Sequence, residues 1–422
     1  MFNELQLQQF WYKQSVSAKG LKTICGKPLS VIDPGIWNNN QGPDFIFSKI
    51  KIGEVEWVGN VEIHIFCSDW FKHKHEDDIN YARIILHVVW KNDVTDFVSS
   101  PVLELSNFID PCAILNNFQL SKSPILSCSL ADKLELDESA HKEIYKLGEK
   151  RIERKTARVL DLFQACGNDF SSVLWLLVFR SFGSVQNAGA FESLFNSIPI
   201  HLLRLYGYDS FKLSALLFGQ AKLIDQGLSD SYPQSLWNEY LQLQKKFKLV
   251  SIIEQMYFLR MRPRNFPTIR LAQLSAFYNK NMSLTSVLLQ TNLHTDLFKL
   301  FQINHHNYWY THYLFDRKSS LVEKQVGQTL IHQTILNAFI PFLLAYGQFT
   351  GDKNQVQKAK NWLAVLGPEI NSLSQTFLRL GFRANSVGDT QGIVELYQNV
   401  CLKNLCALCP RGSKIQLKNF TN

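Results

Sequence analysis

Alternating apolar and polar positions dominate the first hundred residues and predict a small sheet. An amphipathic opening segment with Leu5, Leu7, Phe10 and Trp11 predicts a helix. Strands are expected where apolar residues alternate, or where β-branched residues run together between turn residues. The expected strands are residues 29–32, 45–52, 55–66 and 82–90. A helix, a hairpin and a buried strand together predict an α/β domain.

Further along the chain the apolar positions repeat with a period near 3.6, which predicts helices such as 134–162 and 170–182. Between the two patterns lies a segment with Pro111 and Pro124 and few periodic positions, as is typical of a linker. We therefore expect an α/β domain at 1–110, a linker at 111–131 and a large all-α domain at 132–422.

Composition fits a folded chain with at least two domains. The 422 residues exceed the roughly 250–300 residues at which a single core usually stops growing. Hydrophobic residues make up 46% and charged residues 19%, which excludes a disordered chain. No apolar run reaches the roughly 18 residues of a membrane span, and the runs at 173–179 and 338–346 predict buried core helices. The first ten residues lack the pattern of a secretory signal, so we expect a cytoplasmic protein without membrane contact.

Charge and cysteine content change this picture only modestly. The formal net charge of +8, from 44 basic and 36 acidic residues, permits DNA or RNA as a partner without requiring either. The eight cysteines are scattered along the chain, so we expect reduced thiols or metal ligands instead of a disulfide framework. The oligomeric state stays open.

Three side chains of the predicted hairpin, Asp44, Glu62 and His64, form the first candidate site. Glu62 and His64 are two residues apart on one strand, so they project to the same face. Two carboxylates at strand ends suit Mg²⁺, and a histidine ligand tolerates Mn²⁺ or Zn²⁺. The alternative is that Asp44 caps a turn and Glu62 is a solvated strand residue.

The register of the hairpin decides whether these side chains meet. With a tight turn at Gly53-Glu54, Asp44 lies opposite residue 63 and misses the shared face. A three-residue loop centred on Glu54, or a bulge near Gly59-Asn60, shifts the register by one and brings Asp44 opposite Glu62 or His64. We expect such an irregularity.

A helix with an acid at Glu4, a strand, Gly-Pro-Asp44 and then Glu62-x-His64 on the next strand resemble the core of restriction-endonuclease-like, or PD-(D/E)XK, nucleases. The resemblance covers the first hundred residues. It implies a mixed sheet, a Mg²⁺ or Mn²⁺ ion held by Asp44 and Glu62, and cleavage of nucleic acid with help from Glu4. His64 stands where these enzymes carry lysine. A histidine can orient or deprotonate a water, but it supplies no fixed positive charge.

The segment after the hairpin contains a second cluster, with Asp69, His73 and His75. If this segment is extended, the two histidines point to one side, and all three residues are candidates for a second shell around the acidic site. One alternative is a solvated charged turn. Another is that His73 and His75 join the metal site of a hydrolase with a non-nucleic substrate. His87, inside an apolar strand, is expected to be a satisfied core residue.

Arginines in the helical part are candidates for substrate binding. Pro263 and Pro267 make an arginine-rich stretch non-helical, and Arg260, Arg262 and Arg270 lie in it or in the helix that follows. Guanidinium groups bind phosphates bidentately. The alternative, which we favour slightly, is that the arginines hold the loop by bonding buried carbonyls and acids.

Two further groups of side chains leave alternatives open. The aromatic residues after His305 either stack on bases or, more commonly, pack in a helical core; they are His306, Trp309, Tyr310, His312 and Tyr313. The spacing of Cys401, Cys406 and Cys409 suits a structural Zn²⁺ or Fe–S site with a fourth ligand from Cys128 or Cys166. Three buried reduced thiols are the alternative for this group.

Motifs along the whole chain look like the signature of an uncharacterised bacterial family, a domain of unknown function with no established activity. They include Ile32-x-Pro34-Gly35, Gly59-Asn60-Val61-Glu62-Ile63-His64, Ser68-Asp69-Trp70-x-x-His73-x-His75 and Arg260-Met261-Arg262-Pro263. The functional expectation therefore rests on the acidic site: a metal-dependent nuclease or phosphodiesterase acting on nucleic acid. The alternatives are a catalytically inactive nuclease-like protein that binds nucleic acid or acts as a scaffold, and a metal-dependent hydrolase of a non-nucleic substrate.

Overall fold

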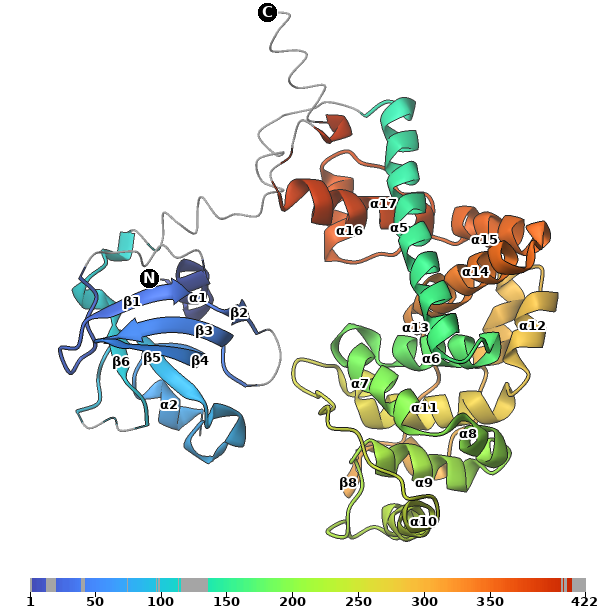
Figure 1. The fold of residues 1–422 in the computed structure, drawn as a ribbon, viewed down its shortest axis with the longest axis horizontal. Coiled ribbons are helices and arrows are strands. Elements are labelled where there is room, and N and C mark those ends of the chain that lie inside the picture. Colours follow the sequence, from blue (N-terminus) through green and yellow to red (C-terminus); the bar gives the residue numbers. More distant parts are fainter. Residues whose placement is uncertain are drawn as a thin grey trace, which may run out of the picture. The chain divides into compact units, whose positions relative to one another are not determined.

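The chain forms two compact units, Met1–Leu126 and Ser127–Asn422 (Figure 1). This computed structural model describes residues 2–12, 20–38, 42–73, 75–95, 97, 99–112, 114, 136–403, 405 and 408–411. The division falls inside the segment 111–131 that the sequence predicts as a linker. Each unit has its own hydrophobic core, and we call them the sheet unit and the helical unit.

A six-stranded mixed sheet is the centre of the sheet unit (Figure 1). β1, β3 and β4 run antiparallel, whereas β4, β5 and β6 run parallel, and β2 pairs with β3. The predicted hairpin strands are confirmed, while β2 and β6 are too short for a periodic signal. The bounds are β1 (Leu29–Asp33), β2 (Ile36–Trp37), β3 (Phe45–Ile52), β4 (Val55–Phe66), β5 (Ile84–Lys91) and β6 (Val102–Glu104).

The predicted opening helix, α1 (Glu4–Tyr12), is also confirmed. Its buried residues Leu7 and Trp11 belong to the same core cluster as Val61 and Ile63 of β4. The Trp11 indole donates a hydrogen bond of 3.1 Å to the carbonyl of Pro34 and ties the helix to the turn after β1. Because side chains alternate along a strand, Glu62 and His64, the residues on either side of Ile63, face the other side of the sheet.

The parallel pairing of β4 and β5 requires a crossover, since a tight turn can join only antiparallel strands. The crossover contains α2 (Asp69–Lys72) and two short 3₁₀ turns, η1 (His75–Asp77) and η2 (Ile79–Tyr81). The helix α2 packs on β4. A short 3₁₀ segment, η3 (Leu105–Asn107), follows β6.

The helical unit confirms the predicted change of pattern. Helix α5 begins at Glu138, four residues after the predicted start, because the Asp137 side chain caps it by accepting the Ala140 N–H at 3.0 Å. The helix predicted at 170–182 is present with those bounds, and Asp169 caps it. A small two-stranded sheet, β7 (His312–Leu314) and β8 (Arg317–Lys318), is an addition that the sequence does not predict.

The other elements of the helical unit have the following bounds: α5 (Glu138–Ala165), α6 (Phe170–Phe182), α7 (Ser184–Ser197), α8 (Ile200–Tyr206), α9 (Ser210–Gln220), α10 (Ser231–Phe247), η4 (Pro263–Asn265), α11 (Pro267–Lys280), α12 (Leu284–Gln290), η5 (His294–Phe301), η6 (Asn307–Tyr310), α13 (Gln328–Thr334), η7 (Ile335–Phe339), α14 (Ile340–Thr350), α15 (Lys353–Val365), α16 (Ser372–Arg379), α17 (Val387–Leu396) and η8 (Tyr397–Cys401). In the described part of the chain, one helical stretch, Gln328–Thr350, is long and apolar enough to cross a membrane by length and composition, and most of it is buried in the fold.

Glycines allow α5 and α17 to cross in backbone contact. A Cβ added to Gly392 would collide with the carbonyl oxygen of Ile144. We expect Gly392→Ala to lower the free energy of unfolding by about 1–3 kcal/mol or more, because a backbone atom cannot move aside cheaply. Gly189→Ala on α7, where the added Cβ meets nothing within 4 Å, is the control and should be neutral or stabilising by up to about 1 kcal/mol. Equal losses in urea unfolding of the two variants would contradict this account.

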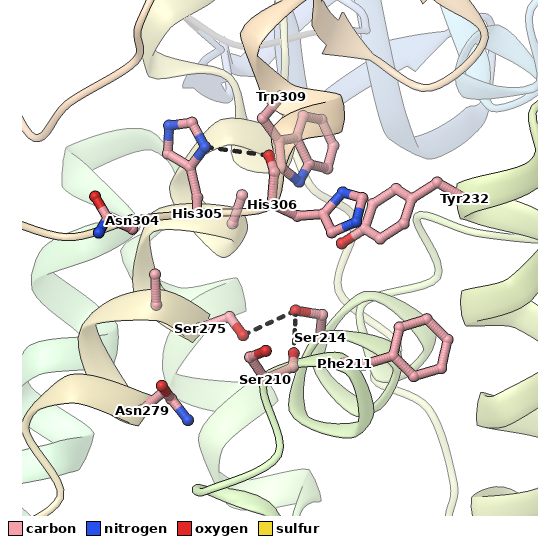
Figure 2. A pocket seen from close by; sticks show the side chains of 12 residues that line it. Ser210, Phe211, Ser214, Tyr232, Ser275, Asn279, Asn304, His305, His306 and Trp309 are labelled. Carbon is pink, nitrogen blue, oxygen red and sulfur yellow. Dashed lines mark hydrogen bonds between the residues drawn. The ribbon is translucent and has the colours of Figure 1, made fainter.

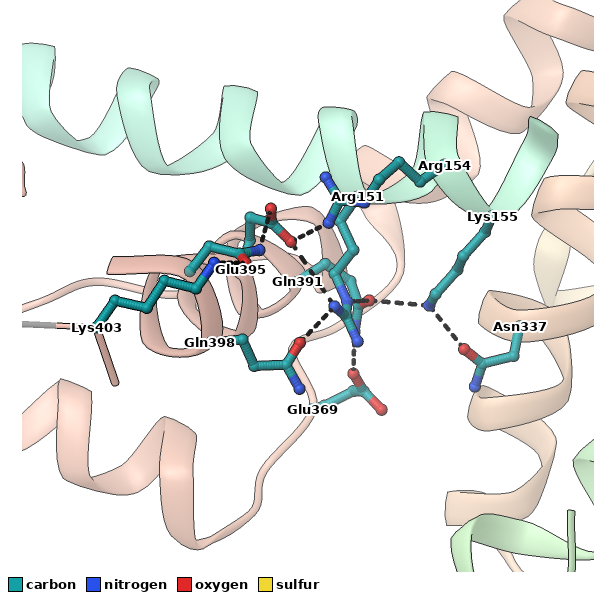
Figure 3. Close-up of polar contacts among 10 residues, drawn as sticks. Arg151, Arg154, Lys155, Asn337, Glu369, Gln391, Glu395, Gln398 and Lys403 are labelled. Atoms are coloured by element: carbon teal, nitrogen blue, oxygen red, sulfur yellow. Dashed lines mark hydrogen bonds and ion pairs between the residues drawn. The ribbon is translucent and has the colours of Figure 1, made fainter. Parts of the chain in front are cut away.

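Polar side chains complete the contact between α5 and α17 (Figure 3). Glu395 is 6% exposed and accepts hydrogen bonds from Arg154 and, at 2.7 Å, from Asn399. Lys155 donates to Gln391 at 2.9 Å on the other side of the same contact. Burial alone raises the pKa of Glu395, but the hydrogen bonds outweigh it and hold that pKa below the ordinary value of 4.5.

The lowered pKa of Glu395 predicts a pH-dependent contribution to stability. The contribution is present above pH 4.5, where the unfolded carboxyl is ionised, and is lost as pH falls through the lower folded pKa. We expect Glu395→Gln to reduce the free energy of unfolding at pH 7 by about 1.5–3 kcal/mol. The difference from wild type should shrink as pH falls below 4.5. A difference that stays constant with pH would contradict the ion pair as its cause.

Candidate metal centre

β4 places Glu62 and His64 on one face of the sheet, as their spacing predicts. Glu62 is 5% exposed and His64 is 1% exposed. Glu62 pairs in register with His87 of the neighbouring parallel strand, so the three side chains share that face. The burial of Glu62 rules out the alternative of a solvated strand residue.

A bulge in β3 brings Asp44 opposite Glu62. Ile52 pairs with Val55, so the turn has two residues, and of the two expected irregularities the three-residue loop is excluded. The register shifts between Phe45 and Ser48, where Phe47 has a φ of 58°. The expected irregularity therefore exists opposite Asn60, but the extra residue belongs to β3.

Two hydrogen bonds show the result of this shift. The Asp44 N–H donates to Glu62 Oε2 at 2.9 Å, and Asp44 Oδ2 accepts the Ile63 N–H at 3.1 Å. These bonds tie Asp44 to Glu62 and to its neighbour Ile63, and an ion shared by the Asp44 and Glu62 carboxylates stays a prediction.

The crossover brings His73 and His75 to the same place. The sequence suggests an extended segment here, but the segment is not extended. His73 is the C-cap of α2, and His75 begins the 3₁₀ turn η1. His64 Nε2 lies 3.2 Å from His73 Nδ1 and 3.5 Å from Glu62 Oε1. His75 Nε2 lies 3.4 Å from Glu62 Oε1. The two crossover histidines thus lie beside the strand residues Glu62 and His64.

These separations match those of a tetrahedral metal site. Bonds of about 2.0–2.1 Å place the ligand atoms of a tetrahedron about 3.3–3.4 Å apart. One ring nitrogen of each histidine lies within 4.8 Å of those of the other two. The nitrogen His75 Nε2 is buried and has no hydrogen-bond partner among the described residues. His64, His73 and His75 can therefore hold one ion, and Glu62 Oε1, which lies 3.5 Å from His64 Nε2 and 3.4 Å from His75 Nε2, is the candidate fourth ligand.

A buried pair behind the site orients His64. His64 Nδ1 lies 2.9 Å from His87 Nε2, and His87 Nδ1 lies 3.9 Å from Cys67 Sγ. If His64 Nδ1–H donates to His87, then His87 carries its hydrogen toward Cys67, and the lone pair of His64 Nε2 is free for an ion. We assign these tautomers from the hydrogen-bond network. His87 is a satisfied core residue, as expected, but it also positions the site.

Burial dominates the electrostatics of this cluster. It raises the pKa of Glu62 to about 8, and burial together with the charge of Asp44 raises the pKa of Glu4 to about 7. It lowers the pKa of His64 far below the ordinary value and that of His87 to about 4. Neutral imidazoles are the form that binds a metal, and a nearby cation removes the penalty on the carboxylate.

Asp69 has a structural contact instead of a ligand position. Its Oδ2 accepts the Phe66 N–H at 3.0 Å and its Oδ1 accepts Lys72 Nζ at 2.6 Å. These bonds close the turn between β4 and α2 and so hold the crossover histidines in place. The sequence predicts Asp69 as a second-shell residue. In the structure it supports the site by fixing the backbone of this turn.

The predicted substrate-binding arginines differ from one another. Arg260 and Arg262 are exposed in the helical unit. Arg270 is 8% exposed and donates to Asn265 Oδ1 at 2.7 Å and to Gln273 Oε1 at 3.0 Å. Arg270 therefore has the interior contacts that we favour for the arginines, and substrate binding by Arg260, Arg262 and Arg270 stays a prediction.

The cysteine prediction falls partly outside the described residues. Cys406 and Cys128 lie in segments that the structure does not describe. Cys409 is 5% exposed, and Cys166 caps the end of α5, where burial raises the pKa of its thiol. The Zn²⁺ or Fe–S site with Cys401 stays a prediction.

The family model described as "Protein of unknown function (DUF2851)" matches residues 4–372. The chain belongs to this family. The DUF2851 match includes Glu4, Asp44, Glu62 and all of the site histidines, whereas the terminal cysteines lie beyond it. No curated protein and no solved structure matches the chain, so the likeness to a nuclease core stays a resemblance of short motifs.

Proposed function

We propose that the sheet unit is a metal-dependent hydrolase whose ion is bound by Glu62, His64, His73 and His75. The single observation that carries this proposal is the set of ligand separations, 3.2, 3.4 and 3.5 Å, among atoms from two segments of the chain. Three imidazoles and one carboxylate favour Zn²⁺ or Mn²⁺ over Mg²⁺, which prefers oxygen ligands.

The neighbouring acids supply a base for hydrolysis. A bound ion of this type lowers the pKa of a coordinated water toward neutrality. Glu4, whose pKa burial and the charge of Asp44 raise to about 7 in the metal-free protein, is the carboxyl that we assign as general acid or base. The Asp44 N–H donates to Glu62, and the charge of Asp44 contributes to the raised pKa of Glu4.

A phosphodiester of nucleic acid is the substrate class that we propose first. Support comes from the net charge of +8 and from the Gly-Pro-Asp44 and Glu62-x-His64 spacing. The inactive-scaffold alternative rests on His64 in place of lysine. That argument weakens when His64 is a ligand, because the site then does not need the lysine.

A non-nucleic substrate is the second candidate, favoured by one observation. His73 and His75 lie within contact distance of the strand ligands, which is the arrangement that distinguishes this alternative. We would incubate the full chain with single- and double-stranded DNA and RNA, and with a chromogenic phosphodiester and carboxylic ester, each with Zn²⁺, Mn²⁺ or Mg²⁺. Metal-dependent cleavage of nucleic acid supports the first candidate, and cleavage of an ester alone supports the second. Cleavage of nothing in the panel contradicts both.

A further inference from the structure

A cavity of about 210 Å³ lies in the helical unit between α9, α11 and the segment 304–309 (Figure 2). Small side chains explain why it exists. Ser210 and Ser214 on α9, like Ala272 and Ala276 on α11, are four residues apart and so share a helix face. Their side chains leave a space that larger residues fill elsewhere in this core.

The cavity has no ionised wall. Its lining residues in the described chain include no aspartate, glutamate, lysine or arginine. Burial lowers the pKa of both lining histidines, His305 and His306, so their rings are neutral near pH 7. A charged ligand would find no countercharge, and burying an unpaired charge is costly. The cavity therefore suits an uncharged molecule.

The side of the cavity formed by α9 and α11 offers hydrogen-bond acceptors. The Ser214 hydroxyl donates to the Ser210 carbonyl at 2.7 Å, so the 2.9 Å contact with Ser275 is donated by Ser275. Ser275 Oγ keeps its lone pairs. Asn279 Nδ2 donates to the Gly207 carbonyl at 2.7 Å, which leaves Asn279 Oδ1 as a second acceptor.

The opposite side is aromatic and offers a donor. His306 stacks on Tyr232 with ring centroids 3.9 Å apart, and its Nδ1 accepts the Tyr308 N–H at 3.2 Å. The neutral ring then carries its hydrogen on Nε2. Figure 2 shows the Tyr232 hydroxyl and the Trp309 indole nitrogen on this side. The Tyr232 oxygen is hydrogen-bonded to Trp309 and to Ser214, so His306 Nε2–H is the donor that this side offers to a ligand.

From this complementarity we propose that the cavity binds an uncharged nitrogen heterocycle of the nucleobase type. Such a ring is flat and carries donors and acceptors on its edges, which matches an aromatic wall with a donor facing a wall of acceptors. The volume equals that of about seven waters at about 30 Å³ each, which admits one or two fused rings. It lies below the roughly 300 Å³ at which drug-sized sites begin. This site does not depend on the metal centre.

Calorimetric titration of the full chain tests the proposal. The probes are adenine, cytosine, uracil and thymine, with benzoate as a charged ring and ribose as an uncharged molecule without a heterocycle. We expect saturable binding of at least one base and no binding of benzoate or ribose. Binding of none of the four bases, or equal binding of benzoate, would overturn the proposal.

Variants locate the binding. Ala276→Phe fills the cavity and should abolish the titration signal, whereas Ser275→Ala removes one polar contact and should weaken binding about tenfold. Ser235→Ala is the control, because it removes an exposed helix hydroxyl that is bonded to Ser231 and does not line the cavity. Base binding that survives Ala276→Phe would place the ligand elsewhere. If Ala276→Phe unfolds, the comparison of Ser275→Ala with Ser235→Ala decides, and equal affinities would contradict the proposal.

Discussion

Replacing His75 with alanine is expected to lower the affinity of the protein for one Zn²⁺ at least about 100-fold, since loss of a mere second-shell partner already costs about 10–100-fold. His75 Nε2 is buried without a hydrogen-bond partner and faces Glu62 Oε1 at 3.4 Å. Removing it leaves three ligands and opens the site to water. Competition with a chromophoric chelator measures this change.

The control for this prediction is His201→Ala, which removes an exposed histidine on α8. It should leave Zn²⁺ affinity and stoichiometry unchanged. Circular dichroism of both variants without metal checks that the fold is kept. Equal affinity of His75→Ala and wild type would remove His75 from the centre, and equal losses in the two variants would show nonspecific binding.

Asp44→Asn is expected to reduce metal-dependent hydrolysis by up to about 10²-fold while the ion stays bound, the lower end of the range for loss of acid–base catalysis, because Glu4 itself is kept. The asparagine side chain can still accept the Ile63 N–H, so the register of the hairpin should persist. It removes the charge of Asp44, which after burial is the second cause of the raised pKa of Glu4, and so lowers the pKa of the proposed base.

Asp33→Asn is the matched control in the same unit. Asp33 also accepts a backbone N–H, from Gly35 at 2.8 Å, but it lies on β1 away from the ligands. We expect wild-type turnover for this variant. Turnover in Asp44→Asn equal to wild type, at equal metal occupancy, would contradict the assigned chemistry or reveal a contaminating enzyme.

The hairpin and the shared face of Glu62 and His64 follow from the sequence because their signals are local. Alternation fixes the face that Glu62 and His64 share, and the Gly53-Glu54 turn fixes the starting register. The need for an irregularity also follows. Its place does not, because Phe47 is a non-glycine residue with positive φ and carries no signal of the kind that glycine gives.

The crossover histidines show the limit of local reasoning. His73 and His75 lie on a short helix end and a 3₁₀ turn, where side-chain direction depends on tertiary packing and not on a period. The Trp70 ring, 2% exposed, packs against His75 and His87 and fixes the crossover on the sheet. An aromatic residue between a strand and a His-x-His pair is the one sequence signal that could have indicated this packing.

In the helical unit, too, some features follow from the sequence and others do not. Helix bounds follow from periodicity and from capping residues such as Asp169. The cavity does not, because small residues at spacing four, such as Ala272 and Ala276, more often mark close helix packing than empty space. Only the three-dimensional arrangement of α9, α11 and the segment 304–309 separates the two outcomes.

X-ray absorption spectroscopy at the zinc edge, on the full chain loaded with one equivalent of Zn²⁺, tests the metal centre most directly. The account predicts a first shell of nitrogen and oxygen at about 2.0–2.1 Å, with the multiple scattering of three imidazoles. His75→Ala should lose one imidazole from that shell. A first shell dominated by sulfur at about 2.3 Å would place the ion at cysteines instead and contradict the centre at Glu62, His64, His73 and His75.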